Sequence, residues 1–129
     1  MSVKWRADRT QIKEPFASDV DALLSADPSV WIITQGFRST AQQDALFAQG
    51  RTTPGPIVTR AKGGQSAHNF GLAVDVTLVT SRGDDWNYEG PDYQRLIAAI
   101  RAAPRLHPGA DFGDFDHIEA VHWQQLKLL

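Results

Sequence analysis

The chain has 129 residues, of which 42% are hydrophobic and 22% charged, and its formal net charge is −2. This length supports one hydrophobic core, so we predict a single domain over residues 1–129. We also expect a monomer. The weakly acidic balance excludes a nucleic-acid partner, and no apolar run is long enough for a membrane span. The chain has no cysteine, so any reactive site must use His, Asp and Glu rather than a thiolate.

The first half of the chain shows a helix, a strand and a second helix. Apolar residues spaced at i, i+4, i+7 and i+8 favour a helix over about 15–25, and a β-branched, aromatic run favours a buried strand over 29–34. A second helix is predicted to end at Gly50. The polar residues that can form its capping box are Ser39 or Thr40 as N-cap and Gln42 or Gln43 at position N3.

The second half begins with a long loop, residues 51–71, which is rich in glycine and proline. Long ordered loops in compact domains are more often functional than idle. Residues 72–79 alternate as a strand whose more polar face carries Asp75, a helix follows at about 93–100, and residues 118–126 are predicted to form a final strand. The pattern favours an α+β domain with a mainly antiparallel sheet packed by about three helices.

Two histidines and two acids stand out as a possible metal site. The stretch SAHNFGLAVD contains His68 and Asp75, and EAVHW contains Glu119 and His122. Two imidazoles and one carboxylate make a catalytic zinc site when the fourth position is left to water. Zinc lowers the pKa of such a water molecule to about 7, and an unligated Glu119 would accept its proton.

Spacing alone leaves the third ligand open. Glu119 and His122 are three residues apart, so a straight strand would send them to opposite faces unless a bulge or a turn intervenes. Asp114 and His117 have the same spacing in the same segment. The residue pattern does not choose between these two pairs.

Three stretches resemble the LAS group of peptidoglycan-cleaving zinc peptidases, over roughly residues 30–124. They are GFRSTAQQDALFAQGRTTPG, KGGQSAHNFGLAVDV and EAVHWQ. This group includes D-alanyl-D-alanine carboxypeptidases and dipeptidases, and the L-alanyl-D-glutamate peptidases found as bacteriophage endolysins. Its motif SxHxxGxAxD is matched by Ser66, His68, Gly71, Ala73 and Asp75.

The resemblance implies a LAS/hedgehog-like metallopeptidase fold and a set of roles for these residues. His68 and Asp75 would be the first two zinc ligands. In this group the last motif of the site is an acid, two further residues, a histidine and an aromatic residue, and EAVHW fits it. The resemblance therefore assigns Glu119 as the base and His122 as the third ligand. Many relatives carry Asp at the acid position. The pair Asp114 and His117 remains the alternative.

The resemblance also implies a substrate and a setting. Arg38 would face the substrate, gripping a carboxylate or the oxyanion of the tetrahedral intermediate, and Ser66 would hydrogen-bond the substrate or hold the loop. We expect a zinc-dependent hydrolase of the L-alanyl-D-glutamate bond, made without a signal peptide in the cytoplasm and acting on the cell wall as an endolysin after holin-type release. The alternatives are a D-alanyl-D-alanine carboxypeptidase and a non-catalytic wall-binding module.

Overall fold

The structure, a computed structural model, describes residues 3–127. The described residues form one six-stranded sheet in the order β1-β2-β3-β6-β5, with β4 paired to β3. Only β1 and β2 run parallel, so the expected mainly antiparallel sheet is confirmed. The strands are β1 (Val3–Trp5), β2 (Val30–Gln35), β3 (Ala73–Thr80), β4 (Gly83–Asp85), β5 (Leu106–Pro108) and β6 (His117–Ala120).

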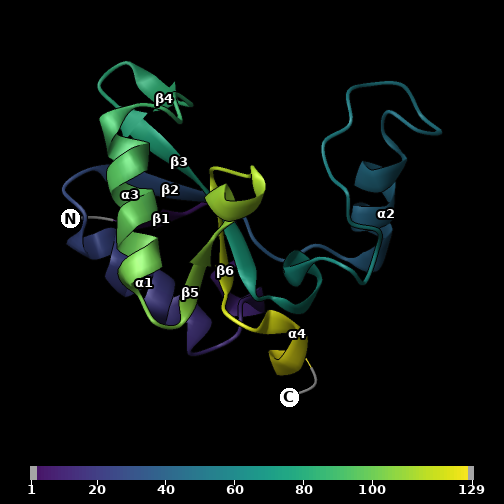
Figure 1. Cartoon of the computed structure of the whole chain (residues 1–129), viewed down its shortest axis with the longest axis horizontal. Coiled ribbons are helices and arrows are strands. Elements are labelled where there is room, and N and C mark those ends of the chain that lie inside the picture. Colours follow the sequence, from purple (N-terminus) through teal and green to yellow (C-terminus); the bar gives the residue numbers. More distant parts are fainter. Residues whose placement is uncertain (1–2, 128–129) are drawn as a thin grey trace.

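Four α-helices accompany the sheet, with short 3-10 turns between elements. In Figure 1, α1 and α3 lie beside the sheet, whereas α2 stands apart from it on the right. None of the helices within residues 3–127 is long and apolar enough to cross a membrane. The helices are α1 (Phe16–Ala26), α2 (Thr40–Ala48), α3 (Pro91–Ala102) and α4 (Trp123–Leu126), and the 3-10 turns are η1 (Arg9–Gln11), η2 (Ala67–Phe70) and η3 (Gly109–Phe112).

One face of the sheet packs against the hydrophobic core, and the other carries polar side chains. Trp31 on β2 lies opposite Leu78 on β3, and both belong to the buried core with residues of α1 and α3. The Trp31 ring packs edge-on against Tyr93 of α3, with ring centroids 5.0 Å apart. Because side chains alternate along a strand, Asp75 and Thr77 of β3 point to the opposite face. That face is free to carry polar chemistry.

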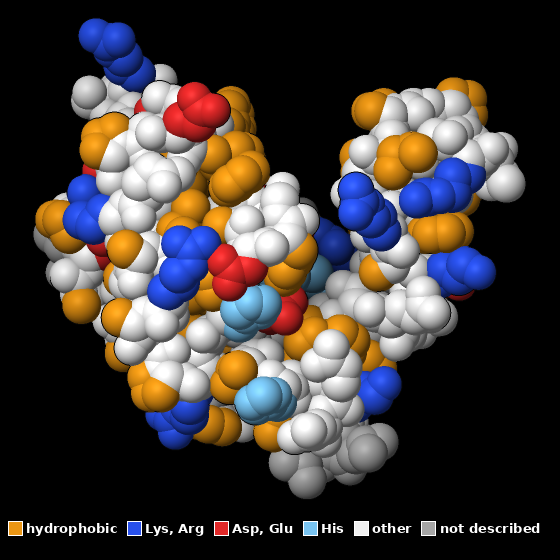
Figure 2. All heavy atoms as spheres, in the orientation of Figure 1, with side chains coloured by type: hydrophobic (Ala, Val, Ile, Leu, Met, Phe, Trp, Pro, Cys, Tyr) orange, Lys and Arg blue, Asp and Glu red, His pale blue; other side chains and the backbone are white. Residues whose placement is uncertain are grey.

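Helix α2 and the loop after it form a lobe of their own, defined by residues 40–66. Ser39 accepts a hydrogen bond from the Gln42 backbone and Gln42 returns one, which selects Ser39 and Gln42 for the capping box. Gln43 is fully buried, and its Nε2 donates to the Ala61 carbonyl at 2.8 Å. Figure 2 shows a hollow between this lobe and the rest of the molecule, with acidic and histidine side chains gathered beside it.

The chain end differs from the sequence prediction. The last strand begins at His117 and ends at Ala120, rather than continuing through residue 126. His122 has a φ of 56°, in the left-handed region, and turns the chain into the short helix α4. The predicted strand over 118–126 is therefore wrong beyond Ala120, because a residue in the left-handed region cannot continue a strand.

Candidate metal centre

His68 is held in place by the residues around it in the motif. It lies in η2, where the Ser66 side chain accepts from the His68 backbone N–H and completes a capping box with Asn69. Gly71 ends the turn with a φ of 67°, a conformation that glycine adopts without strain. The His68 Nδ1 lies 2.7 Å from the Gly36 carbonyl oxygen. This carbonyl accepts the Nδ1 proton and leaves Nε2 as the free nitrogen.

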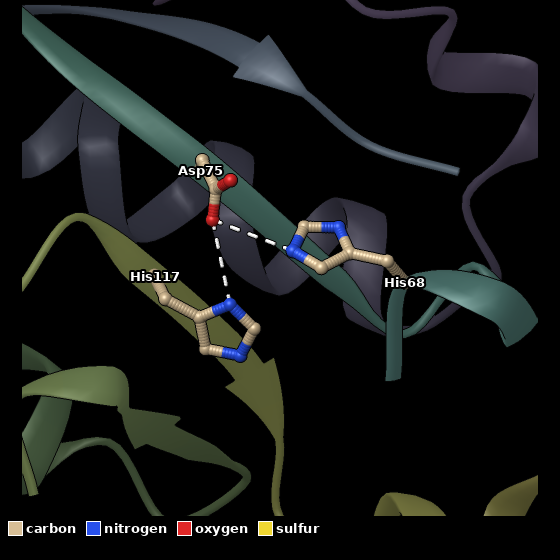
Figure 3. A group of neighbouring side chains, drawn as sticks. All are labelled: His68, Asp75 and His117. Carbon is tan, nitrogen blue, oxygen red and sulfur yellow. Dashed lines mark ion pairs between the residues drawn. The ribbon is translucent and has the colours of Figure 1, made fainter. Parts of the chain in front are cut away.

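Asp75 and His117 face each other across neighbouring strands. They are direct partners in the register of β3 and β6 and project from the face that α1 and α3 leave open. The Asp75 Oδ1 lies 3.4 Å from His117 Nδ1 and 3.4 Å from His68 Nε2. Figure 3 shows both rings pointing toward this carboxylate oxygen, His68 from η2 and His117 from β6.

These three side chains offer a donor set suited to a metal ion. One atom from each of His68, Asp75 and His117 lies within 4.8 Å of the others. Among residues 3–127, the buried side-chain atoms without a hydrogen-bond partner are Asp75 Oδ1 and His117 Nδ1. Buried polar atoms nearly always have a hydrogen-bond partner. Two neighbouring buried atoms without one therefore fit a site that binds a metal ion. Two imidazoles and one carboxylate favour zinc.

The electrostatics of the cluster reflect this proximity. Burial favours the neutral acid of Asp75, but the adjacent imidazoles of His117 and His68 outweigh it and hold the pKa of Asp75 far below its usual value. Burial likewise disfavours the charged ring of His117, yet Asp75 and Glu119 raise the pKa of His117 to about 10. The raised pKa favours a second proton on the His117 ring, and a bound metal must displace that proton.

The structure brings His117, rather than the expected His122, to this cluster. His122 is exposed and sits in the turn that begins α4, and it belongs to neither potential metal-binding group found among the described residues. The cause is the strand boundary. Since β6 starts at His117, this residue comes opposite Asp75, whereas His122 lies beyond the end of the strand.

The same strand boundary sets the position of Glu119, which the sequence led us to expect as the base. Its Oε1 lies 2.7 Å from His117 Nε2, on the opposite side of the ring from the Nδ1 that approaches Asp75. Asp114 instead lies near that approach, with its Oδ2 3.6 Å from His117 Nδ1 and its side chain 53% exposed. The alternative pair from the sequence, Asp114 and His117, is thus the one that the fold brings to the cluster.

The other predicted site residues are placed as follows. Arg38 Nη2 lies 3.2 Å from Asp75 Oδ2, and its side chain is only 18% exposed. Arg38 also borders an open cavity of about 380 Å³ beside α2, together with Phe37 and Gln42. Ser66 acts on the loop, because its hydroxyl caps η2. Sequence reasoning gave Gln43 a capping role, but this buried amide lies 3.4 Å from Arg38 Nη1 and supports it.

An α+β domain that brings together two imidazoles, a carboxylate and a nearby exposed acid fits the class of metal-dependent hydrolases. Comparison with known families is more specific. Residues 9–101 match the family VanY, described as D-alanyl-D-alanine carboxypeptidase. The chain therefore belongs to this peptidase family, which confirms both the resemblance seen in the sequence and the expectation of an enzyme.

Individual relatives agree with this assignment. The chain is 34% identical to the peptidoglycan L-alanyl-D-glutamate endopeptidase CwlK of Bacillus subtilis, over 92% of this chain and 83% of the relative. Its fold is similar to that of the L-Ala D-Glu endopeptidase ChiX of Serratia marcescens, with a TM-score of 0.66, 17% identity, and coverage of 92% and 86% of the two chains.

A second solved structure is the vancomycin-resistance D,D-pentapeptidase VanY in complex with Zn(II). It has a TM-score of 0.55 and 19% identity, and the match covers 89% of this chain and 75% of that one. These likenesses confirm the predicted LAS metallopeptidase fold.

Proposed function

We propose that the protein is a zinc-dependent peptidase that hydrolyses the L-alanyl-D-glutamate bond in the stem peptide of peptidoglycan. The observation that carries the proposal is that one ligand atom from each of His68, Asp75 and His117 lies within 4.8 Å of the others. Two atoms of this cluster, Asp75 Oδ1 and His117 Nδ1, are buried without a hydrogen-bond partner. When bound there, zinc supplies a Lewis acid that polarises a carbonyl and lowers the pKa of a water molecule.

The remaining chemistry belongs to the protein's own side chains. Asp114 is near the cluster and half exposed, so it is placed to take a proton from the attacking water and pass it to the leaving amine as the C–N bond breaks. Arg38 holds Asp75 Oδ2 and keeps Oδ1 aimed at the two rings. Arg38 also borders the cavity beside α2, and a guanidinium there is suited to bind a substrate carboxylate.

Two related bonds compete as the target. The 34% identity to an L-alanyl-D-glutamate endopeptidase across 92% of this chain favours the L-alanyl-D-glutamate bond. The family description, D-alanyl-D-alanine carboxypeptidase, supports release of terminal D-alanine as the second candidate. The two activities leave different products, so one assay separates them.

The biological setting is also part of the proposal. The segment ALFAQGRTTPGPIVTRAKGGQS resembles the compact endolysin and sporulation-type members of the group, which supports a role in lysing bacterial walls. Expression in a bacterial host with and without a holin tests this role. Lysis that requires the holin is expected, and lysis without it would contradict the release route.

The test of the activity uses defined muropeptides and mass spectrometry of the products. Zinc-loaded protein should release fragments cut after L-alanine. His117→Ala should lose both zinc and turnover, whereas His122→Asn, which keeps a residue tolerant of the left-handed turn, should retain both. Loss of terminal D-alanine alone would assign the second activity. If His117→Ala still binds zinc fully, the proposed metal centre is wrong.

A further inference from the structure

A second acid stands directly behind the proposed metal ligand His117. Glu119 is two residues further along β6, so its side chain points to the same face of the sheet. Its Oε1 lies 2.7 Å from His117 Nε2, and its side chain is only 13% exposed. The ring of His117 therefore has one nitrogen committed to Glu119 and the other, Nδ1, aimed at Asp75.

This arrangement decides which nitrogen can bind a metal. A neutral imidazole has one N–H and one lone pair, and a metal takes the lone pair. Because the Glu119 carboxylate can only accept, the proton of a metal-bound His117 must stay on Nε2. The lone pair is then on Nδ1, the nitrogen that faces the cluster. In His68 the nitrogens have the opposite roles. The Gly36 carbonyl oxygen accepts the Nδ1 proton, so the lone pair is on Nε2.

A third side chain keeps Glu119 itself in position. His107 lies directly opposite Glu119 in the pairing of β5 and β6, and its Nδ1 is 3.4 Å from Glu119 Oε2. The other nitrogen of His107 lies 3.1 Å from Asp111 Oδ2. Both oxygens of Glu119 thus have a ring nitrogen as neighbour, which fixes the rotation of the carboxylate.

We propose that Glu119 is a positioning residue that holds His117 in the tautomer and ring orientation required for ligation through Nδ1. The inference rests on the proposed function for the existence of the metal centre and adds the residue that orders one of its ligands. Carboxylate partners of metal-bound histidines typically change metal affinity by about 10–100-fold when removed. Glu119 acts through His117 and touches neither substrate nor metal.

The experiment compares Glu119→Ala and Glu119→Gln, with Glu89→Ala as control because Glu89 is an exposed acid on another segment. Zinc affinity is measured by competition with a chromophoric chelator. Glu119→Ala should bind zinc about 10–100-fold more weakly. Glu119→Gln should recover most of this loss, because its amide oxygen still accepts from Nε2–H. Glu89→Ala should match the parent protein.

A second readout detects the hydrogen bond itself. In zinc-loaded protein labelled with ¹⁵N-histidine, the Nε2–H proton of His117 should be protected from exchange with water in the parent and in Glu119→Gln. It should exchange rapidly in Glu119→Ala. A merely structural loss of the side chain would lower the melting temperature without moving this signal selectively.

The outcomes separate this inference from the proposed function. If Glu119→Ala binds zinc as tightly as the parent while His117→Ala does not bind, the positioning role is wrong and the metal centre stands. Equal losses in Glu119→Ala and Glu119→Gln would also overturn it, because negative charge rather than hydrogen-bond acceptance would then be responsible. If His117→Ala binds zinc as tightly as the parent protein, both the positioning role of Glu119 and the proposed metal centre are wrong.

Discussion

Asp114 and Glu119 are two acids that flank His117 with different surroundings. Glu119 is enclosed at the rear of the ring, whereas Asp114 is 53% exposed and lies on the side of Nδ1. A group that exchanges protons with substrate and water needs access to both. Exposure and side of approach, rather than residue type, are therefore the grounds on which we propose Asp114 as the base and Glu119 as the supporting residue.

We expect Asp114→Asn to keep zinc and lose turnover. An amide of the same shape cannot accept a proton, and removal of a general base typically lowers kcat by about 10²–10⁴-fold. Metal analysis and muropeptide hydrolysis by the same sample check both halves of the prediction. Asp84→Asn, a change at the distant β4 hairpin, should leave both unaltered. If Asp114→Asn is fully active, Asp114 is not the general base, and another acid of the site must take that role.

The sequence was enough to predict His68 and Asp75 as members of this site, but it predicted the third proposed ligand only in part. His68 and Asp75 sit in a long motif in which glycine and a regular strand leave little freedom. His117 and His122 could not be separated by spacing. A period of two would have favoured His117, since His117 and Glu119 then share the polar face while Ile118 and Ala120 are buried.

At the scale of elements, the turn η3 lets β6 approach the site closely. A Cβ on Gly109 would collide with the Asp114 carbonyl and lie 2.6 Å from His117 Cβ. We therefore expect Gly109→Ala to displace the His117 segment and weaken zinc binding by at least tenfold, measured by chelator competition. Gly113→Ala is the matched control, because its φ of 83° strains the backbone but no atom lies within 4 Å. Equal zinc affinities in the two variants would contradict this role of Gly109.

A buried carboxylate joins α1, β2 and α3. Asp27 accepts from Trp31 Nε1 at 2.9 Å and from Arg95 Nη2 at 2.9 Å. Burial opposes its ionisation, but Arg95, Trp31 and the Ser29 backbone together hold the pKa of Asp27 below its usual value. Asp27→Ala should cost about 2 kcal/mol, since it leaves the buried indole N–H unpaired. Asp92→Ala, at a more exposed ion pair with Arg95, should cost less than about 1 kcal/mol.

The same carboxylate predicts how stability depends on pH. A pKa that is lower in the folded than in the unfolded state makes a contribution that is complete above about pH 4 and disappears as the pH falls through the folded value. Asp27→Asn should therefore reduce the free energy of unfolding at neutral pH and flatten its decrease in acid. Urea unfolding between pH 2 and pH 7 measures both. An unchanged acid slope would show that Asp27 is not the group concerned.

The helices α1 and α3 and the strand β3 followed from the sequence because their hydrophobic periods are regular. The short strands β1, β4 and β5 have three residues each, too few for a period to be seen. Their positions depend on partners distant in the chain, and the tertiary register that places β6 between β3 and β5 leaves no local signal.

At the scale of the whole molecule, the proposed ligands join three separate segments, η2, β3 and β6. A metal that binds the native state alone stabilises it, by about 4 kcal/mol at a thousand times its dissociation constant. We expect zinc to raise the melting temperature by roughly 15 °C over chelator-treated protein, measured by calorimetry. His117→Ala should show no such rise and His122→Asn the full one. A rise that survives in His117→Ala would locate the stabilising ion elsewhere.

The position of β6 in the sheet has a consequence for the order in which the protein is made. β3 and β5 are separated by a strand that emerges from the ribosome after both of them. Until residues 117–120 are translated, β5 has no strand to join it to β3, and His68 and Asp75 lack the third proposed ligand, His117. A growing chain can therefore assemble the proposed metal centre only after residues 117–120 have been made, and deleting these residues would also separate β5 from β3.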